Sequence, residues 1–251
     1  MLQTDFVGGF AKGLRVIEAF GEDASRLTIT EVARITGLDR ATTRRLLLTL
    51  SSLGYAEFDG KYFSLLPRIL RLGHAYLLAT QLPRIVQPFL DQLSSRVGHS
   101  ASASVLDGAE IIYVARAAQQ RVMSVNLMPG SRLPAYCSSM GRVLLAALSE
   151  DAARAVIAGA ARPALTVHTR TDVAELMEEL RRVRDQGYAV IDQEIELGLC
   201  SIAVPVLNRR GQVVAALNIG APAAQISAAR LAEAYLKDLL ATQAEIRSAL
   251  A

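Results

Sequence analysis

Cysteine is scarce in this chain, and long apolar runs are missing. The 251 residues include two cysteines, Cys137 and Cys200, without C-x-x-C spacing. That number is too small for a disulfide scaffold and is typical of a reducing compartment. No stretch approaches the roughly 18 apolar residues of a membrane span, and residues 1–14 carry an acid and polar residues where a signal peptide has an apolar core. These absences predict a soluble, cytoplasmic protein with no membrane partner.

Catalytic and metal-binding signatures are missing as well. The sequence has no G-x-S-x-G, P-loop, G-x-G-x-x-G or H-E-x-x-H motif, and its three histidines lie far apart. Asp192, Glu194 and Glu196 alternate after an apolar run, a pattern that suits either acid–base chemistry or the anchoring of a loop. Because no nucleophile accompanies them, the anchoring role is favoured. We predict no catalytic residue, no metal and no cofactor, so the chain is not expected to be an enzyme.

The chain is long enough for two domains, and 51% of its residues are hydrophobic, which is ample material for their cores. Lys and Arg number 27 against 24 Asp and Glu, a formal net charge of +3. This excess is a weak pointer toward polyanions, and basic and acidic residues balance within residues 1–66. The position of each arginine therefore matters more than the total.

Residues 1–66 show the pattern of three helices followed by a hairpin. Residues 10–20 place apolar side chains at helical spacing. Thr28 and Glu31 have the S/T-x-x-E spacing of a capping box for a short second helix, and Asp39 is placed to cap a third. Two short helices joined around a glycine predict a helix-turn-helix.

The hairpin completes a winged helix-turn-helix. The runs YAEF and KYFSL are typical of strands, and Asp59-Gly60 between them is a strong hairpin signal. The predicted DNA-binding domain therefore covers residues 1–66. A helical pattern predicts a linker helix over residues 67–82, and a second domain covers residues 83–251.

The third helix is expected to divide into a core face and a solvent face. The apolar spacing assigns the core face to Thr42, Leu46, Leu50 and Leu53. The opposite face then consists of Arg40, Thr43, Arg44, Leu47 and Ser51. A DNA-reading helix presents its N-terminal turns to the major groove, where arginine pairs with guanine and threonine contacts a base edge or a thymine methyl.

Arg44 is the candidate for base edges and Arg45 for a phosphate. An arginine pair is also common at the start of a solvated helix. The wing favours DNA binding, because Lys61 and Tyr62 follow the turn where a backbone or minor-groove contact is made. The candidate DNA contacts are Thr30, Arg40, Thr42, Thr43, Arg44, Arg45, Lys61 and Tyr62.

Residues 83–251 alternate between strand-like runs and helical patterns. Strands are predicted at residues 100–106, 110–117, 122–127, 188–192, 201–207 and 212–220. Helices are predicted at residues 139–148, 150–158, 172–185 and 227 to about 250. This order predicts an α+β domain built on a mostly antiparallel six-stranded sheet flanked by helices.

A small-molecule pocket is the favoured interpretation of this second domain. Ser138 and Ser139 begin a helix whose backbone N–H groups and positive dipole end suit a carboxylate, although an ordinary serine N-cap explains them equally well. Candidates for a carboxylate clamp and an aromatic wall are Arg116, Arg121, Arg132, Tyr113 and Tyr136. The two cysteines are interpreted as small core residues.

The chain resembles the IclR family of bacterial transcriptional regulators over essentially its full length. The resemblance to the family's winged helix-turn-helix is carried by GGFAKGLRVIEAF, TITEVARITGLDRATTRRLLLTLSSLGY and KYFSLLPRILRLG. The resemblance to its GAF-like effector-binding domain is carried by SRLPAYCSSMGRVLLAAL, RDQGYAVIDQEIELGLCSIAVPV and GQVVAALNIGAP. EIIYVARA and VMSVNLMPGSRLPAYCSSMGRVLLAAL are similar to the subgroup that controls catabolism of protocatechuate and 4-hydroxybenzoate through the β-ketoadipate pathway.

The resemblance implies an effector between the sheet and the SSMGR helix, covered by the ELGLCSIA segment. It points to Ser201, where some members have cysteine, and to Asn218, where others have serine. Cys200 lies one residue earlier, which leaves open whether it faces the pocket. The candidate effector contacts are Arg121, Tyr136, Ser139, Met140, Gly141, Asp192, Ser201 and Asn218.

The expected function is that of a DNA-binding transcriptional regulator modulated by a small carboxylate effector, either an aromatic acid or its ring-cleavage product. The resemblance implies homodimers or dimers of dimers, formed through the N-terminal and linker helices on a palindromic double-stranded operator. RNA polymerase is a further partner if the regulator activates. The alternatives are a non-aromatic organic acid as effector, a ligand-binding module without DNA function, and a small-molecule-processing enzyme.

Overall fold

The computed structural model describes residues 6–21, 24–119 and 127–250 of the chain. It divides into two compact units, residues 1–79 and 80–251. The 3₁₀ helix η2 (Pro67–Ile69) and helix α4 (Leu70–Ala79) belong to the first unit, although the sequence suggested a separate linker there. Helix α5 (Leu82–Val97) opens the second unit, with Pro83 in its first turn, where a missing N–H costs no hydrogen bond.

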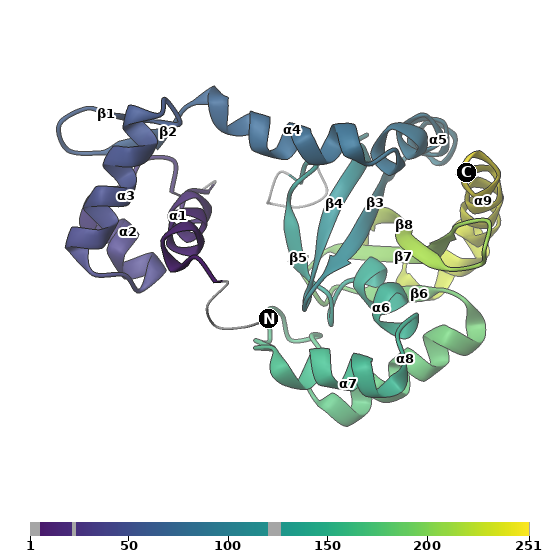
Figure 1. Ribbon diagram of the computed structural model, residues 1–251. Helices are drawn as coiled ribbons and strands as arrows, with labels where there is room; N and C mark the ends of the chain where they lie inside the picture. Colours follow the sequence, from purple (N-terminus) through teal and green to yellow (C-terminus); the bar gives the residue numbers. More distant parts are fainter. Residues whose placement is uncertain (1–5, 22–23, 120–126, 251) are drawn as a thin grey trace. The chain divides into compact units, whose positions relative to one another are not determined.

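The first unit is a winged helix-turn-helix. It contains helices α1 (Gly8–Glu18), α2 (Ile29–Thr36) and α3 (Arg40–Ser52), followed by the hairpin of β1 (Ala56–Phe58) and β2 (Phe63–Leu65) (Figure 1). The predicted capping box is present: Thr28 Oγ1 accepts from the Glu31 N–H, and the Glu31 carboxylate accepts from the Thr28 N–H at 2.7 Å. Asp39 caps α3 by accepting from the Thr42 N–H at 2.8 Å, as predicted.

The core face of α3 is rotated from the predicted one. Thr43 and Leu47 are fully buried, whereas Leu53 is 54% exposed. The spacing of residues 43, 47 and 50 satisfies a helical stripe as well as the predicted spacing does. Thr43 is tolerated in the core because its hydroxyl donates to the Asp39 carbonyl oxygen at 2.9 Å. The assignment of Thr43 and Leu47 to the solvent face was therefore wrong.

The second unit is built on one antiparallel sheet of six strands in the order β5-β4-β3-β8-β7-β6 (Figure 1). Its strands are β3 (Ser100–Asp107), β4 (Glu110–Ala117), β5 (Arg132–Pro134), β6 (Ala189–Asp192), β7 (Leu199–Leu207) and β8 (Val213–Pro222). The predicted strand at 122–127 lies almost wholly outside the described residues. The edge strand β5 is instead formed by residues 132–134, further along the chain. The predicted α+β class and the six-stranded antiparallel sheet are confirmed.

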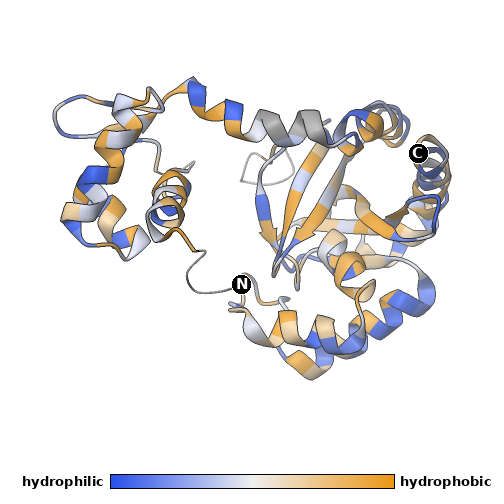
Figure 2. Cartoon of the chain, viewed as in Figure 1, coloured by the Kyte–Doolittle hydropathy of each residue, from blue (hydrophilic) through white to orange (hydrophobic). Residues whose placement is uncertain are grey.

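Helices cover both faces of the sheet. On one face, α5 and α9 (Ala228–Ala249) pack on apolar strand residues such as Ile202, Leu217 and Ile219. On the other, α6 (Ser139–Ala146), α7 (Glu150–Gly159) and α8 (Val173–Gln186) cover Ala203 and Ala216. Figure 2 shows the hydrophobic colouring of the central strands and the hydrophilic residues along α8. None of the helices in the described parts of the chain combines the length and the apolar composition that a membrane span requires.

Candidate functional site

Helix α3 presents three arginines to solvent. Arg40, Arg44 and Arg45 are exposed, and none forms an ion pair within the described parts of the chain. All three lie in its first two turns, which begin at the Asp39 cap. The Asp39 carboxylate accepts a hydrogen bond from the Thr42 N–H, and this bond lowers the pKa of the Asp39 carboxyl. The start of α3 therefore carries arginines that are free to bind a DNA phosphate or to hydrogen-bond a guanine edge.

The wing is fixed by Asp59. Its carboxylate accepts from the backbone N–H groups of Lys61 and Tyr62 at 2.9 and 2.8 Å, and it pairs with Arg26. The Tyr62 ring has Arg26 on it at 5.2 Å and Lys61 at 4.9 Å from the ring centroid. Two cations and an aromatic ring thus gather at the tip of the predicted wing.

The three threonines among the predicted DNA contacts differ in their exposure to solvent. Thr30 is exposed at the start of α2, and Thr42 is half-buried. Thr43 is buried and its hydroxyl is occupied, so it cannot contact a base. The physical reason is the rotation of α3 described above.

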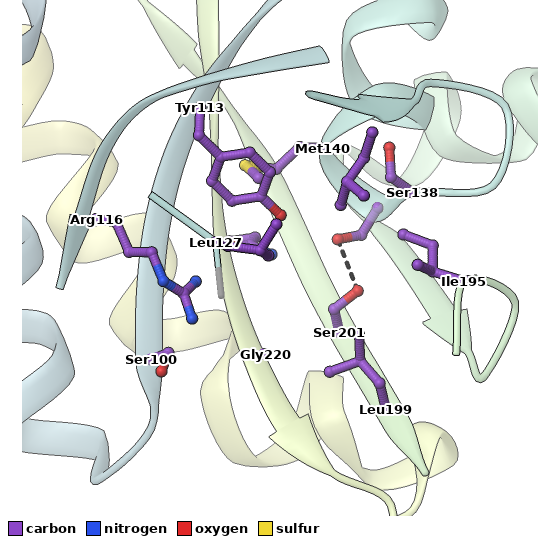
Figure 3. Close-up of a pocket in the computed structure, with 13 residues that line it drawn as sticks. Ser100, Tyr113, Arg116, Leu127, Ser138, Met140, Ile195, Leu199, Ser201 and Gly220 are labelled. Carbon is purple, nitrogen blue, oxygen red and sulfur yellow. Dashed lines mark hydrogen bonds between the residues drawn. The ribbon is translucent and has the colours of Figure 1, made fainter. Parts of the chain in front are cut away.

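The second unit has a pocket between the sheet and the start of α6 (Figure 3). Two lining residues, Arg116 and Asn218, are the cross-strand partners of Ser102 in one row of the sheet, and Ser100, Gly220 and Ser201 line the pocket from the next row. Figure 3 shows Arg116 and Tyr113 on one side, with Ser138, Ser201 and Ile195 on the other. The cavity volume is about 30 Å³, room for a water molecule or two.

A β-bulge brings Tyr113 and Arg116 to the same side of the sheet. The register of β3 against β4 shifts between Ala103 and Ser104, whose partners are Ala115 and Tyr113. Strict alternation would place residues three apart on opposite faces. The extra residue in β4 removes that difference, and both side chains then line the pocket.

Arg116 is a half-buried cation. Its Nη1 donates to Ser102 Oγ at 2.9 Å, while no carboxylate of the described residues lies near it. Burial lowers its pKa, yet a guanidinium stays charged at any physiological pH. Tyr113 beside it is neutral, since burial raises its pKa to about 12. The pocket therefore offers an anion a positive charge at the edge of an apolar space.

The start of α6 forms the opposite wall. Ser138 caps the helix by accepting from the Gly141 N–H at 3.1 Å, and Ser201 Oγ donates to Ser139 Oγ at 2.9 Å. Met140 is buried and lines the pocket with Ser138 and Ser139. The helix dipole adds partial positive charge at this end.

Some buried side-chain atoms of this pocket have no hydrogen-bond partner. In the described parts of the chain they are Ser104 Oγ, Arg116 Nε and Asn218 Oδ1. Two of the three residues line the pocket, and Ser104 lies two residues along β3 from Ser102, on the same face. Such atoms are rare in folded proteins, and two of the three belong to residues of this one pocket.

The segment of residues 193–198 closes the pocket between β6 and β7, and Ile195 reaches into it. Glu194 is buried and accepts from Arg142 Nη2 at 2.7 Å and from the Arg170 N–H at 3.1 Å. It therefore anchors the segment, the role favoured for it from sequence.

Several predicted effector contacts lie elsewhere. Gly141 packs against Ala135 and does not line the pocket, and the Tyr136 hydroxyl donates to the Pro163 carbonyl. Asp192 accepts from Cys200 Sγ at 3.2 Å and lines a separate polar cavity beside α8 and α9. These three predicted contacts therefore lie outside this pocket, because a helix turn and a strand end point their side chains in directions that spacing alone does not fix.

The predicted arginine clamp is reduced to one residue of the described chain. Arg121 lies outside the described residues. Arg132 is 45% exposed and pairs with Asp107 and Glu110 at 2.6 and 2.7 Å. Arg116, Ser139, Met140, Ser201 and Asn218 do gather in the pocket. Cys200 packs in the core on the other face, so the neighbouring Ser201 and not the thiol lines the site.

Both units match models of one protein family. Residues 10–60 match the IclR helix-turn-helix domain, and residues 74–248 match the bacterial transcriptional regulator IclR C-terminal domain. The chain belongs to the IclR family of bacterial transcriptional regulators. The predicted family is confirmed, and this IclR-family protein is a transcriptional regulator and not an enzyme.

The IclR-family regulator has close relatives. It is 44% identical to the Pca regulon regulatory protein of Pseudomonas putida, over 96% of this chain and 84% of the relative. It is 40% identical to the p-hydroxybenzoate hydroxylase transcriptional activator of Acinetobacter baylyi, over 97% of this chain and 92% of the relative. A solved structure of a double mutant of the PobR inducer-binding domain from Acinetobacter, in complex with 3-hydroxybenzoic acid, is 35% identical. It matches with a TM-score of 0.63 and covers 67% of this chain and 98% of that one.

Proposed function

We propose that this regulator binds operator DNA through α3 and the wing, and that an aromatic acid or its ring-cleavage product binds in the pocket beneath α6 and changes its activity at the operator. The observation that carries the effector site is the pair of unpartnered buried atoms on residues that line the pocket, Arg116 Nε and Asn218 Oδ1, with the unpartnered Ser104 Oγ next to the pocket on β3. Each such atom costs about 1 to 3 kcal/mol of stability. A ligand that supplies the missing partners recovers this free energy on binding.

Arg116 is the proposed partner of the effector carboxylate. It is the charged side chain on the pocket lining, and no described carboxylate neutralises it. Charge-assisted hydrogen bonds to a carboxylate are roughly twice as strong as neutral ones. The names of the Pca regulon and p-hydroxybenzoate relatives, and the 3-hydroxybenzoic acid in the PobR domain, support an aromatic acid.

Effector binding is proposed to move the pocket walls. A volume of about 30 Å³ is too small for an aromatic ring, so α6 or the 193–198 segment must shift outward to admit one. A ligand that binds the widened state better than the contracted one shifts the balance between them. A coupling of about 1 to 3 kcal/mol would change operator affinity about 5- to 150-fold.

DNA recognition is assigned to Arg44 for base edges and Arg45 for a phosphate, with Thr30, Arg40, Thr42, Lys61 and Tyr62 as further contacts. A palindromic operator requires a dimer. Exposed apolar side chains on two helices support one: Phe10 and Leu14 on α1, and Leu70 and Tyr76 on α4. Such side chains gain stability when a second copy of the chain covers them. The cytoplasm is the proposed location, since the operator lies there.

The experiment is a DNase footprint of the purified regulator on the DNA upstream of its own gene. It is run with and without a panel of aromatic acids, at fixed salt. We expect a two-fold symmetric footprint whose affinity or pattern changes with at least one acid. Arg116→Ala is expected to keep the footprint and lose the response. A footprint that no acid alters, or a response retained by Arg116→Ala, contradicts the effector assignment.

A further inference from the structure

The pocket floor offers one unused donor and one unused acceptor. Arg116 Nε–H can only donate a hydrogen bond, and Asn218 Oδ1 can only accept one. Asn218 is buried, with 9% of its surface exposed, and the described residues provide no donor for its oxygen. A ligand that satisfies both atoms must carry an acceptor and an O–H or N–H donor.

The two residues that carry these atoms lie in one cross-strand row of the sheet. Arg116 on β4 and Asn218 on β8 flank Ser102 on β3, two strand spacings or roughly 10 Å apart at the backbone. The Arg116 side chain turns back along this row, since its Nη1 reaches Ser102 Oγ at 2.9 Å. In the widened pocket, a single ring with substituents at two positions would bridge Arg116 and Asn218, with Tyr113 and Met140 as apolar walls.

We propose that Asn218 Oδ1 accepts a hydrogen bond from a ring hydroxyl of the effector while Arg116 holds its carboxylate. Asn218 is then the residue by which the regulator distinguishes hydroxylated aromatic acids from unsubstituted benzoate and from ring-opened dicarboxylates. The inference rests on the proposed function, because it places an aromatic acid in this pocket. It selects among the effectors that the proposed function leaves open.

The selection has a physical basis in what each ligand leaves unpaired. Benzoate satisfies Arg116 but brings no donor for Asn218. A dicarboxylate places a second carboxylate, which can only accept, against the Asn218 oxygen, which can also only accept. A site built to hydrogen-bond a hydroxyl rejects an analogue that lacks it strongly, because the buried protein atom stays unpaired. We expect about 10- to 100-fold weaker binding of benzoate than of the preferred hydroxylated acid.

Isothermal titration of the full-length protein tests this assignment. The ligands are benzoate, 3-hydroxybenzoate, 4-hydroxybenzoate, 3,4-dihydroxybenzoate and 3-oxoadipate. In the wild type, at least one hydroxylated acid should bind about 10- to 100-fold more tightly than benzoate and 3-oxoadipate. Asn218→Ala should weaken that acid by the same factor and leave benzoate affinity within about threefold, so that the preference disappears.

Ser201→Ala is the matched control within the pocket. Its hydroxyl already donates to Ser139 at 2.9 Å, so this variant should shift the affinities of benzoate and the hydroxylated acid together or leave both unchanged. Thermal unfolding is the second readout. Asn218→Ala should not lower the melting temperature, since it removes an unpartnered buried acceptor. A purely structural role would lower it and weaken all ligands alike.

The failure of this inference differs from the failure of the proposed function. A hydroxyl preference that survives in Asn218→Ala, that moves to Ser201→Ala, or that is absent from a wild type binding all the carboxylates overturns the role of Asn218 alone. The effector site would stand if Arg116→Ala still weakened every acid. If no acid of the panel binds to a folded, DNA-binding protein, both proposals are overturned.

Discussion

Arg142 and Glu194 form a buried ion pair, with 2.7 Å between Nη2 and Oε2, that ties helix α6 to the 193–198 segment. Their side chains are 1% and 5% exposed. Arg142 Nε also donates to the Tyr136 carbonyl at 3.1 Å. Burial lowers the pKa of Arg142, which Glu194 and then Glu179 oppose. Because Met140 and Ile195 line the proposed effector pocket from these two elements, the pair holds its two walls together.

Glu194→Gln is expected to destabilise the second unit by up to about 3 to 5 kcal/mol, because it leaves the buried Arg142 with the more distant Glu179, at 3.9 Å, as its carboxylate partner. Urea unfolding followed by circular dichroism measures the loss. Arg132→Gln is the control, since Arg132 is 45% exposed in its ion pairs and should cost about 0 to 1 kcal/mol. Equal losses in the two variants would show that the buried pair has no special role.

Gly141→Ala is expected to disrupt the packing of α6. An added Cβ would lie 2.2 Å from the Ala135 carbonyl oxygen and 2.4 Å from its Cα, both backbone atoms that cannot rotate away. Overpacking of this kind costs at least about 1 to 3 kcal/mol. Gly159→Ala is the control, because nothing lies within 4 Å of its added Cβ, so its melting temperature should stay close to that of the wild type. The prediction is wrong if both variants unfold at the wild-type temperature.

Substitutions of the two adjacent arginines of α3 are expected to change DNA binding in different ways. Arg44→Ala should remove about 1 to 3 kcal/mol of discrimination between the operator and a sequence with one altered half-site. Arg45→Ala should weaken binding to both sequences alike and lower the slope of log affinity against log salt by about 1.

Fluorescence anisotropy at four salt concentrations separates the two effects. Arg230→Ala, on an exposed turn of α9, serves as the control and should change neither quantity. If Arg44→Ala altered only the salt slope, Arg44 would be a phosphate contact and the base-reading role would move to Arg40.

Local sequence signals predicted much of the fold, whereas features that depend on contacts distant in sequence were not predicted. The capping box of Thr28 and Glu31 and the Asp39 cap depend on residues three apart, and both are present. The face of α3 was misassigned because the observed stripe of residues 43, 47 and 50 and the predicted stripe of residues 42, 46, 50 and 53 both have helical spacing. Packing against the rest of the core decides between them. No local rule chooses between Thr42 and Thr43.

The lining of the pocket depends on a β-bulge, which the alternation of residues along a strand does not reveal. Arg116 was one of three candidate arginines, and Tyr113 one of two candidate tyrosines. They share a side of the sheet because of the bulge opposite Ala103 and Ser104. A bulge is set by the pairing of two strands, so neither strand alone announces it. The buried pairing of Arg142 with Glu194 was likewise out of reach, since the two residues are 52 positions apart.

Cys137 and Cys200 are expected to be unreactive in the folded protein. Both are buried, and burial raises the pKa of each thiol to about 12; the Asp192 carboxylate adds to the effect at Cys200. At pH 8 about one thiol in ten thousand is then a thiolate, the form that reacts with alkylating reagents. Iodoacetamide at pH 8 should modify the native protein very slowly, and unfolding in urea should expose two fast-reacting thiols.

The same shifts predict a loss of stability at alkaline pH. A thiol whose pKa is raised from 9.0 to about 12 on folding holds its proton more tightly in the folded state. Its contribution to stability is complete below pH 9 and is lost as the pH rises toward 12. The free energy of unfolding should therefore fall between pH 9 and 12. Cys137→Ala with Cys200→Ala should flatten this decline, leaving the part that Tyr113, Tyr136 and Tyr235 contribute, since burial raises the pKa of each of these hydroxyls as well. A double variant with the full wild-type decline would assign the alkaline transition to other groups.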